Sequence, residues 1–428
     1  MPEWKKGPLG WAVRVQGGYP FSSTAFVDKG VPVVRMSNMK NGRLDLSQAK
    51  CLDKTALEKF KSFVLQPGDL LLGMSGSIEN FAEVHADDLP ALLNQRVGRL
   101  QVKDDALVCR EYLKFVVTSK RFRDQVLTMA AGVAQLNISS KQLESIPICY
   151  PPLPEQQKIA AILASVDAVI EKTDAIIAQV QVVKKGLTQQ LFTQGIGHTA
   201  FVQTKMGTIP EGWSLVRLKE IAKVKGGKRV PKGSSLTDTV TPYPYIRVSD
   251  FGEHTVRMEQ LKYATEEIYS KIKRYTISRR DIYLSIAGIY LGVAGRVPDA
   301  LDGALLTENA AKITPTSDQV DLDYLMFALG SEFCQRQIAV LKGVTGVPKL
   351  GLKRVETMLV PLPPLEEQQK IVAGIKSVLS KRNIEEARLQ QLRAVKKALM
   401  QMLLTGSVRV QPDEAAGESR PASVPSRV

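Results

Sequence analysis

Two segments of the chain carry apolar residues at alternating intervals of three and four, a spacing that predicts a helix with one apolar stripe. The first stripe is held for about four heptads, which is typical of a coiled-coil seam. Its members are Ile159, Ile162, Val166, Val169, Thr173, Ile176, Val180, Val183 and Leu187. The second stripe is polar in its middle, and its apolar members are Ile371, Val378, Leu392, Val395, Leu399 and Met402.

We therefore predict two long helices of ~58 Å each, at 1.5 Å per residue. Such a helix is too long to be buried inside a small domain, so we expect the two to pair with each other. The alternative is that each helix packs only on the globular segment that precedes it. The lysine pairs 184–185 and 396–397 can touch a partner or lie on a solvated face.

Both helices are expected to begin at nearly the same sequence, PPLPEQQKIA at 151–160 and PPLEEQQKIV at 363–372. Proline suits the first helical turn, because that turn has no intrahelical use for the missing N–H. Glu155 would meet the positive end of the helix dipole. The two motifs mark the points where a globular segment ends and a long helix begins.

The shift that places Glu155 on Glu367 aligns residues 155–193 with 367–405 without a gap. The same shift carries Arg35-x-Ser37-Asn38 onto Arg247-x-Ser249-Asp250. The chain is thus two copies of one unit, too few for a solenoid, and we interpret it as a fused pseudo-dimer. Proteins with such two-fold symmetry usually recognise two half-sites in nucleic acid.

We expect five parts along the chain: a globular domain, a helical spacer, a second globular domain, a second spacer and a disordered tail. Their predicted bounds are 1–150, 151–197, 198–360, 361–408 and 409–428.

Each globular segment mixes short strand-like runs with one amphipathic helix. The runs lie at 31–39 and 66–77 in the first copy and at 243–251 and 278–290 in the second. The helices are expected at 111–129 and 323–341. This pattern predicts an α+β fold, with two α+β domains joined by the two long helices as an antiparallel coiled coil.

The net charge of +15 implies a polyanionic partner, with nucleic acid first and an acidic membrane surface second. The densest basic cluster, KVKGGKRVPKG, surrounds the Gly226-Gly227 turn, where backbone and lysines could approach phosphates closely. The candidate DNA-binding residues are Arg35, Lys40, Arg43, Arg96, Lys223, Lys225, Lys228, Arg229, Lys232, Arg247, Lys271, Lys273 and Arg274. Further basic residues that cluster in the segments are Arg99, Lys120, Arg121, Arg123, Arg279 and Arg280.

Signatures of catalysis are missing from the sequence. The three histidines have no metal-ligand or triad spacing, and no glycine-rich cofactor loop follows a strand. Asp69 and Asp281 occupy matched positions, but aspartate in such a turn is first a turn residue. We expect a binding protein that is not an enzyme and that holds no metal or cofactor.

Four scattered cysteines favour a reducing cytoplasm. Because no run approaches ~18 apolar residues, we expect no membrane span.

The repeated helix motif, from PPLPEQQKIAAIL to VKKGLTQQLFTQG and from PPLEEQQKIV to VKKALMQMLLTG, resembles the specificity subunits of type I restriction–modification systems. MGTIPEGW and the runs PGDLLLGMSGS and DIYLSIAGIYLGVAG fit as well. The resemblance implies that residues 153–195 and 365–406 are the conserved helical regions. It implies two target-recognition domains, each recognising one half of a bipartite, asymmetric DNA site.

The resemblance also implies partners: double-stranded DNA, two methyltransferase subunits that bind S-adenosylmethionine, and two restriction subunits that use ATP, with Mg²⁺ expected on the partners. It supplies no short DNA-contact motif, so the basic clusters remain an inference from charge. Two other hypotheses stay open, a DNA-binding scaffold or regulator without sequence preference and an enzyme that acts alone.

Overall fold

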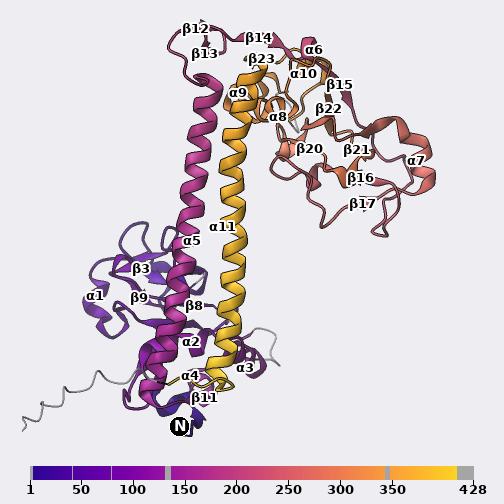
Figure 1. Cartoon of the computed structure of the whole chain (residues 1–428). Helices are drawn as coiled ribbons and strands as arrows, with labels where there is room; N and C mark the ends of the chain where they lie inside the picture. The colour runs from indigo at the N-terminus through magenta and orange to yellow at the C-terminus, as the bar shows by residue number, and fades with distance from the viewer. Residues whose placement is uncertain (1–2, 41, 79, 131–135, 343–347, 412–428) are drawn as a thin grey trace, which may run out of the picture. The chain divides into compact units, whose positions relative to one another are not determined.

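The computed structural model describes residues 3–40, 42–78, 80–130, 136–342 and 348–411 (Figure 1). The chain divides into two compact units. Unit 1 comprises Met1–Asp174 with Arg388–Val428, and unit 2 comprises Ala175–Ala387. Each unit contains one globular α+β part, which we call head 1 (3–150) or head 2 (198–362), and half of each long helix.

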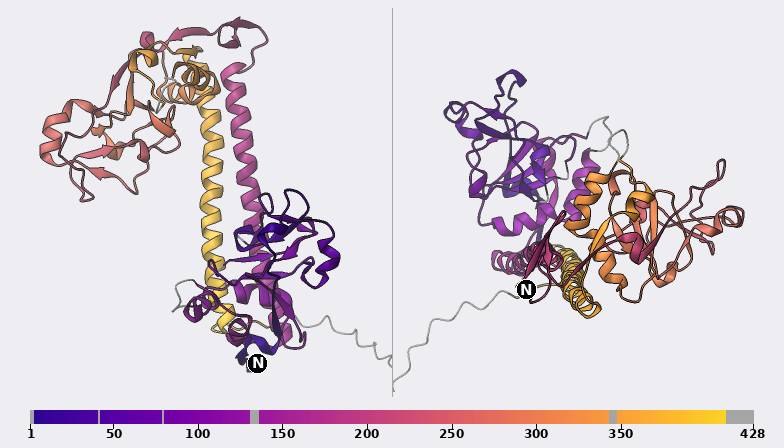
Figure 2. Two further views of the ribbon diagram at one scale, coloured as in Figure 1. Left: turned by 180° about the vertical axis from the view of Figure 1, so that it is seen from behind. Right: turned by 90° about the horizontal axis from the view of Figure 1, so that it is seen from above.

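The predicted long helices are present as α5 (Leu153–Thr193) and α11 (Leu365–Thr405), each of 41 residues. Within unit 1 the two run antiparallel, because Asp167 pairs with Lys396 at 2.5 Å and Asp174 pairs with Arg393 at 3.4 Å. The residue numbers rise along one helix while they fall along the other. Both views in Figure 2 show the two ribbons side by side in this unit.

Within unit 2 the other halves of α5 and α11 also pack together. Leu191 shares a hydrophobic core with Ile371 and Ile375, and Leu187 and Leu379 pack against that core. Pairing of the long helices, one of the two alternatives left by the sequence, is therefore present in each unit, and each helix end also contributes to the core of a head.

The apolar stripe that faces the partner helix differs from the predicted one at every second position. Val169, Ile176 and Val183 are 36%, 36% and 51% exposed, and Val395 is 49% exposed. The less exposed positions of α5 are Ile159, Leu163, Val166, Ile170, Thr173, Ile177, Val180, Lys184, Leu187 and Leu191. Those of α11 are Ile371, Ile375, Val378, Arg382, Glu385, Leu389, Leu392, Lys396, Leu399 and Leu403.

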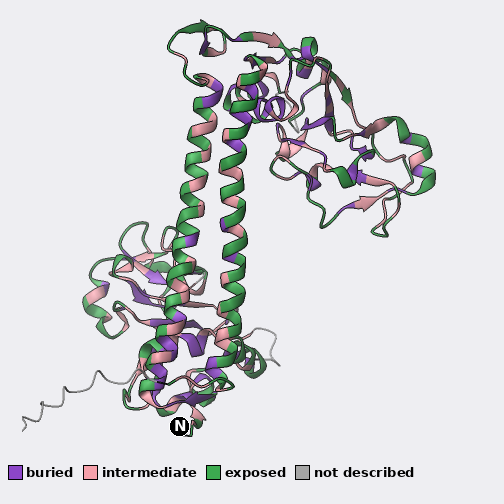
Figure 3. Cartoon of the chain, in the orientation of Figure 1, coloured by how far each residue is buried: buried purple, intermediate pink, exposed green. Residues whose placement is uncertain are grey.

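The prediction was wrong at Val169 and Ile176 because an apolar residue follows each of them, and it was wrong at Val183 and Val395 because lysines, Lys184 and Lys396, take the less exposed positions there. Ile176 is followed by Ile177, for example, so the apolar pattern alone did not identify which of the two faces the partner helix. Met402, which is 37% exposed, is a further miss, and the remaining predicted positions, including Ile162 at the border of the core of head 1, lie on the less exposed side. Figure 3 shows how the exposed residues alternate with partly buried ones along both helices.

Head 1 is built on a four-stranded antiparallel sheet in the order β2-β10-β7-β8. Smaller sheets are β6-β3-β9, β4-β5 and β1-β11. The strands are β1 (Lys5–Pro8), β2 (Val13–Gly17), β3 (Val31–Val34), β4 (Met39–Lys40), β5 (Arg43–Leu44), β6 (Cys51–Leu52), β7 (Leu70–Gly73), β8 (Phe81–Glu83), β9 (Leu92–Leu93), β10 (Val97–Val102) and β11 (Pro147–Tyr150). The helices are α1 (Ala56–Lys59), α2 (Arg110–Thr118), α3 (Lys120–Ala130) and α4 (Ser140–Ser145).

Head 2 repeats this plan with the sheet β15-β22-β19-β20, which is accompanied by β17-β16-β21-β18, β14-β23 and β12-β13. Its strands are β12 (Phe201–Thr204), β13 (Gly207–Pro210), β14 (Ser214–Arg217), β15 (Ala222–Gly226), β16 (Pro244–Ile246), β17 (Lys262–Tyr263), β18 (Thr276–Ile277), β19 (Ile282–Ser285), β20 (Ala294–Arg296), β21 (Ala304–Leu306), β22 (Ala310–Pro315) and β23 (Leu359–Leu362). Its helices are α6 (Leu218–Ile221), α7 (Glu266–Ile272), α8 (Leu322–Gly330), α9 (Glu332–Leu341) and α10 (Leu352–Glu356).

The single amphipathic helix predicted in each head is in fact two helices, α2 and α3 in head 1 and α8 and α9 in head 2. The breaks fall at Ser119 and Ser331, whose backbones are extended, with ψ of 149° and 155°. The Ser119 hydroxyl accepts a hydrogen bond from Phe122 N at 3.2 Å and so caps the second helix. The apolar periodicity continues across the serine, and it therefore concealed the break.

The repeated motif at the start of each long helix forms the same joint twice. In unit 1, the fully buried Gln156 donates to the carbonyl oxygens of Leu107 and Pro151 at 2.7 and 2.8 Å, and it accepts from Cys109 N. In unit 2, Gln368 makes the equivalent three bonds with Gln319 O, Pro363 O and Asp321 N. Buried amides satisfied in this way fix the exit of the long helix from its head.

The five-part division of the chain stays a prediction, since each head shares its core with ends of both long helices. The predicted tail begins at Arg409, which donates to Glu155 at 2.7 Å, and Val410 packs on the core of head 1. Residues 412–428 lie outside the described part of the chain. In the described part, no helix is both long and apolar enough to cross a membrane.

Candidate nucleic-acid interface

Two basic clusters that are far apart in the sequence meet in head 2. Lys223 and Lys225 are exposed on β15, two residues apart and hence on one side of the strand. Lys228, just beyond β15, places its Nζ 5.7 Å from the centre of the Tyr275 ring. Tyr275 is the last residue of the 3₁₀ turn Lys273–Tyr275. The lysines of β15 therefore lie next to the second basic cluster, which contains Lys271, Lys273 and Arg274.

The basic residues of this surface differ in whether their side chains have ion-pair partners. Lys223, Lys225, Lys232, Lys273 and Arg274 are exposed, and within the described residues their side chains have no hydrogen-bond or ion-pair partner. Lys271 instead pairs with Glu267 at 2.6 Å along α7. The five unpaired side chains are the ones best able to neutralise phosphates.

Arg229, also predicted to bind DNA, is held by a carboxylate. Its Nε donates to Glu308 Oε1 at 2.6 Å, although the Arg229 side chain is 79% exposed. Burial, the largest single influence, opposes ionisation of Glu308, but the hydrogen bonds from Arg229, Thr307 and the backbone, with the charge of Arg229, together keep the pKa of Glu308 below its ordinary value. The pair reduces the positive charge that Arg229 can offer to a phosphate.

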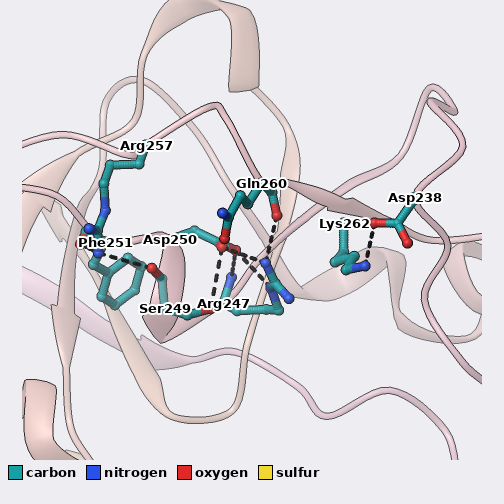
Figure 4. Close-up of polar contacts among 8 residues, drawn as sticks. All are labelled: Asp238, Arg247, Ser249, Asp250, Phe251, Arg257, Gln260 and Lys262. Carbon is teal, nitrogen blue, oxygen red and sulfur yellow. Dashed lines mark hydrogen bonds and ion pairs between the residues drawn. The ribbon is translucent and has the colours of Figure 1, made fainter. Parts of the chain in front are cut away.

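Arg247 has a structural role in head 2 (Figure 4). Its Nε and Nη2 donate to the two carboxylate oxygens of Asp250 at 3.0 and 2.7 Å, and Nη2 also donates to Gln260 O at 2.7 Å. Asp250 is 3% exposed. Arg247 neutralises a buried carboxylate and fixes a turn, and its contact with DNA stays a prediction.

The matching residues of head 1 lack that ion pair. Asn38 stands where head 2 has Asp250, and its Oδ1 accepts from Arg35 N at 3.0 Å. The Nε of Arg35 is buried and has no hydrogen-bond partner in the described residues. Neutral Asn38 therefore leaves the charge of Arg35 uncompensated on the same turn.

Other predicted residues of head 1 make exposed ion pairs. Lys40 pairs with Asp45 at 2.7 Å, and its hydrogen bond lowers the pKa of Asp45 to about 2. Arg43 lies 3.9 Å from Glu171 of α5, with both side chains mostly exposed. Such pairs contribute little to stability, so Lys40 and Arg43 remain available to DNA.

The buried Arg99 does not belong to an exposed basic cluster. Its guanidinium bonds to Asp69 at 3.2 Å and to the carbonyls of Ser62 and Val64. Asp69 also accepts from Gln66 N at 2.8 Å, and Asp281 accepts from Ser278 N at 2.8 Å. The expectation that both aspartates are turn residues is thus confirmed.

Gly227 lies where the backbone leaves room only for a glycine, and the predicted approach of this turn to phosphates stays a prediction. A Cβ at this position would lie 2.1 Å from Thr307 O. Gly18 is equally confined in head 1, where a Cβ would lie 2.3 Å from Asn94 O. The glycine lets the end of β15 pass close to the backbone that follows β21.

An ionic cluster that the sequence did not predict joins head 2 to the helices of unit 2. Glu253 accepts from Lys184 of α5 and from Arg382 of α11. The neighbouring His254, with a φ of 63°, packs edge-on against Phe327. Burial, with added repulsion from Lys184 and Arg382, lowers the pKa of His254 to about 4. These contacts between a loop and two helices orient the head.

Two concave surfaces lie in unit 1. A groove of about 1080 Å³ runs between α2, α3 and the end of α11, and its lining includes Lys120, Arg121 and Arg123. A smaller recess of about 520 Å³ is lined by Arg96 with polar neighbours that include Gln95 and Asn137. Among the described residues, no His, Cys, Asp or Glu side chains form a group that could hold a metal ion.

Known proteins resemble the chain over most of its length. The model of the type I restriction modification DNA specificity domain matches residues 1–182 and 210–394. The MjaVIII specificity subunit of a type I restriction enzyme from Methanocaldococcus jannaschii is 25% identical, over 93% of this chain and 88% of the relative. The EcoBI specificity subunit from Escherichia coli is 24% identical, over 99% and 91%.

Solved structures share the fold. The crystal structure of a type I restriction–modification S subunit from M. genitalium is 15% identical, covers 94% of this chain and 96% of its own, and has a TM-score of 0.52. A chain from a structural study of the assembly and conformational transition of a type I system is 17% identical, covers 95% and 99%, and has a TM-score of 0.59. The predicted class, two α+β domains with two long helices as an antiparallel coiled coil, is confirmed.

Proposed function

The chain belongs to the type I restriction–modification DNA specificity family, and from this premise we propose that each head recognises one half of a bipartite, asymmetric DNA site. Membership of this family gives the chain a role in DNA sequence specificity and makes it a non-catalytic recognition subunit. Relatives are named specificity subunits of restriction enzymes. The recognised DNA is then acted on by other subunits.

The observation that carries this proposal is one fold occurring twice with different surfaces. The joints at Gln156 and Gln368 are the same, and so are the central sheets. The turn that holds Arg35 beside a neutral Asn38 in head 1 holds Arg247 against Asp250 in head 2. Two similar scaffolds with dissimilar side chains suit two different half-sites.

The partners in this proposal are double-stranded DNA, two methyltransferase subunits and two restriction subunits. S-adenosylmethionine, ATP and Mg²⁺ would be bound by those partners, and this chain would position them on DNA. The exposed sides of α5 and α11 are available for docking, with Ile176 and Val183 among their apolar residues.

Mapping of methylated adenines in the native genome tests the function. We expect one two-part motif that disappears when the gene is deleted and returns when it is restored. A motif that persists after deletion would exclude the proposed role. If the purified chain with its partners binds all duplexes equally and only with strong salt dependence, the scaffold without sequence preference is the better account.

A further inference from the structure

The recess of head 1 is formed by three segments that are distant in the sequence. Met74 and Ser75 follow β7, Gln95 and Arg96 lie between β9 and β10, and the residues around Asn137 precede α4. Backbone hydrogen bonds fasten the segments: Met74 N donates to Arg96 O at 2.8 Å, and Ile138 N donates to Met74 O at 2.9 Å. Main-chain hydrogen bonds therefore hold the three lining segments together.

Head 2 contains the same backbone frame. Ile286 N donates to Asn309 O at 2.9 Å, and Leu350 N donates to Ile286 O at 2.8 Å. The bridge between Ser75 and Asn137 in head 1 recurs between Ala287 and Lys349.

A glycine completes the frame in each head. Gly76 N donates to Leu136 O at 2.7 Å, and Gly288 N donates to Pro348 O at 3.0 Å. Their φ angles of 77° and 74° fall in the left-handed region that favours glycine. The main chain of the frame is thus conserved between the two copies down to single hydrogen bonds.

The side chains on the frame are not conserved between the copies. Gln95, Arg96 and Asn137 of head 1 are replaced by Glu308, Asn309 and Lys349 in head 2. In head 1 all three side chains are exposed, and within the described residues none has a hydrogen bond or an ion pair. Arginine and the amides Asn and Gln are the side chains that pair with guanine and adenine edges.

Head 2 offers a different set of contacts on the same frame. The side chains of Asn309 and Lys349 make no hydrogen bond or ion pair within the described part of the chain. Ile289, next to the frame, is 93% exposed, and an apolar side chain in this position can contact a thymine methyl. Glu308 is already held by Arg229, so it serves to position that arginine.

We propose that this repeated frame carries the specificity-determining residues: Gln95, Arg96 and Asn137 contact base edges in one half-site, and Ile289, Asn309 and Lys349 contact them in the other. The inference rests on the proposed function, because it locates the base contacts of a site that the function requires. A shared frame with different side chains explains how two copies of one fold recognise different sequences.

The experiment uses the full chain with its methyltransferase partners, both in the cell and as a purified complex on duplexes that carry the mapped site. In Arg96→Ala and Asn137→Ala, we expect discrimination at one or two positions of a single half-site to fall about ten- to a hundredfold. Asn309→Ala should relax the other half-site only. Lys141→Ala, which removes an exposed charge from α4 outside the recess, should leave the motif unchanged.

Arg96→Lys separates base contacts from phosphate contacts. It retains the charge but loses the planar fork, so affinity should recover while discrimination stays low. Equal weakening on all duplexes in Arg96→Ala, or full discrimination in Arg96→Lys, would overturn the assignment of Arg96 to a base.

The result can also separate this inference from the function itself. If deletion of the gene removes the motif while Arg96→Ala, Asn137→Ala and Asn309→Ala leave it intact, the assignment of base contacts to the frame is wrong. The proposed function would then still hold. Because these side chains have no internal partners, the variants should unfold at the wild-type temperature, which verifies that any loss of discrimination is local.

Discussion

Trp213 donates its indole N–H to Glu367 Oε2 at 3.0 Å, and Trp4 donates to Glu155 Oε2 at 2.9 Å in the other copy. The first tryptophan of each head is thereby tied to the first turn of the long helix that follows that head. The third partner differs: His198 contacts Glu367, whereas Arg409 contacts Glu155. The repeated proline-to-helix motif therefore forms a joint, which we call the closure, at which the start and the end of a head both contact the first turn of one long helix.

The buried glutamine of this closure should dominate its stability. Gln156→Leu leaves two carbonyls and the Cys109 N–H without their partners, and we expect a loss of about 2–4 kcal/mol in the free energy of unfolding. Gln157→Leu changes the exposed neighbour and should stay within about 0.5 kcal/mol. Urea unfolding of both variants measures the difference, and equal losses would show that the buried bonds are unimportant.

The register of the helix pair can be tested with two adjacent isoleucines. Ile177 lies on the less exposed side of α5, whereas Ile176 is 36% exposed. Ile177→Ala should cost about 1–2 kcal/mol more than Ile176→Ala, because the less exposed Ile177 loses more packing against its neighbours. Thermal unfolding distinguishes them, and the reverse order would restore the stripe expected from the sequence.

His254 should make the stability of unit 2 depend on pH. Its pKa of about 4 lies below the ordinary value of 6.5. Between these two pH values the unfolded chain binds a proton at His254 and the folded chain does not. This contribution to stability is complete above about pH 6.5 and declines as the pH falls toward 4.

Urea unfolding at pH 7 and pH 5 measures that decline. Wild type should lose up to about 2 kcal/mol more than His254→Asn, since asparagine does not titrate and tolerates the positive φ. The charged groups around His254 are Glu253, Lys184 and Arg382, and they are the same in both proteins. Equal pH dependence would show that His254 is protonated in the folded state.

The unpaired lysines of head 2 should contribute to binding through phosphates. Lys223→Ala and Lys273→Ala should each weaken binding on every duplex and should lower the slope of log K against log salt by about 0.9. Lys205→Ala, an exposed lysine outside the predicted interface, should leave the slope unchanged. Fluorescence anisotropy at several salt concentrations gives the slopes, and a loss restricted to one sequence would contradict phosphate contact.

The sequence predicted both long helices, because prolines and a heptad pattern mark them, and the helices lie inside the predicted spacers 151–197 and 361–408. It missed part of the correct stripe, because neighbouring apolar pairs such as Ile176 and Ile177 left the register open and because Lys184 and Lys396 lie on the less exposed side. It missed the breaks at Ser119 and Ser331, since the apolar pattern continues through them.

The pattern of basic residues in the sequence located the basic surface of head 2. It could not reveal that Asp250 neutralises Arg247, or that Arg99 is buried and paired with Asp69. Those pairs depend on which turns and strands the fold brings together. The frame around Arg96 and Asn137 could not be predicted from the sequence for the same reason, because its three segments meet only in the folded head.

The central claim is that each head recognises one half-site, and a chain with two identical heads tests it most directly. Residues 213–363 can be replaced by residues 4–151, since the exchange begins and ends at matched contacts, Trp4 with Trp213 and Pro151 with Pro363. Methylated adenines are then mapped in cells that carry the chimera and the native partners. We predict that the asymmetric motif becomes an inverted repeat of the head 1 half-site, whereas an unchanged asymmetric motif would contradict the account.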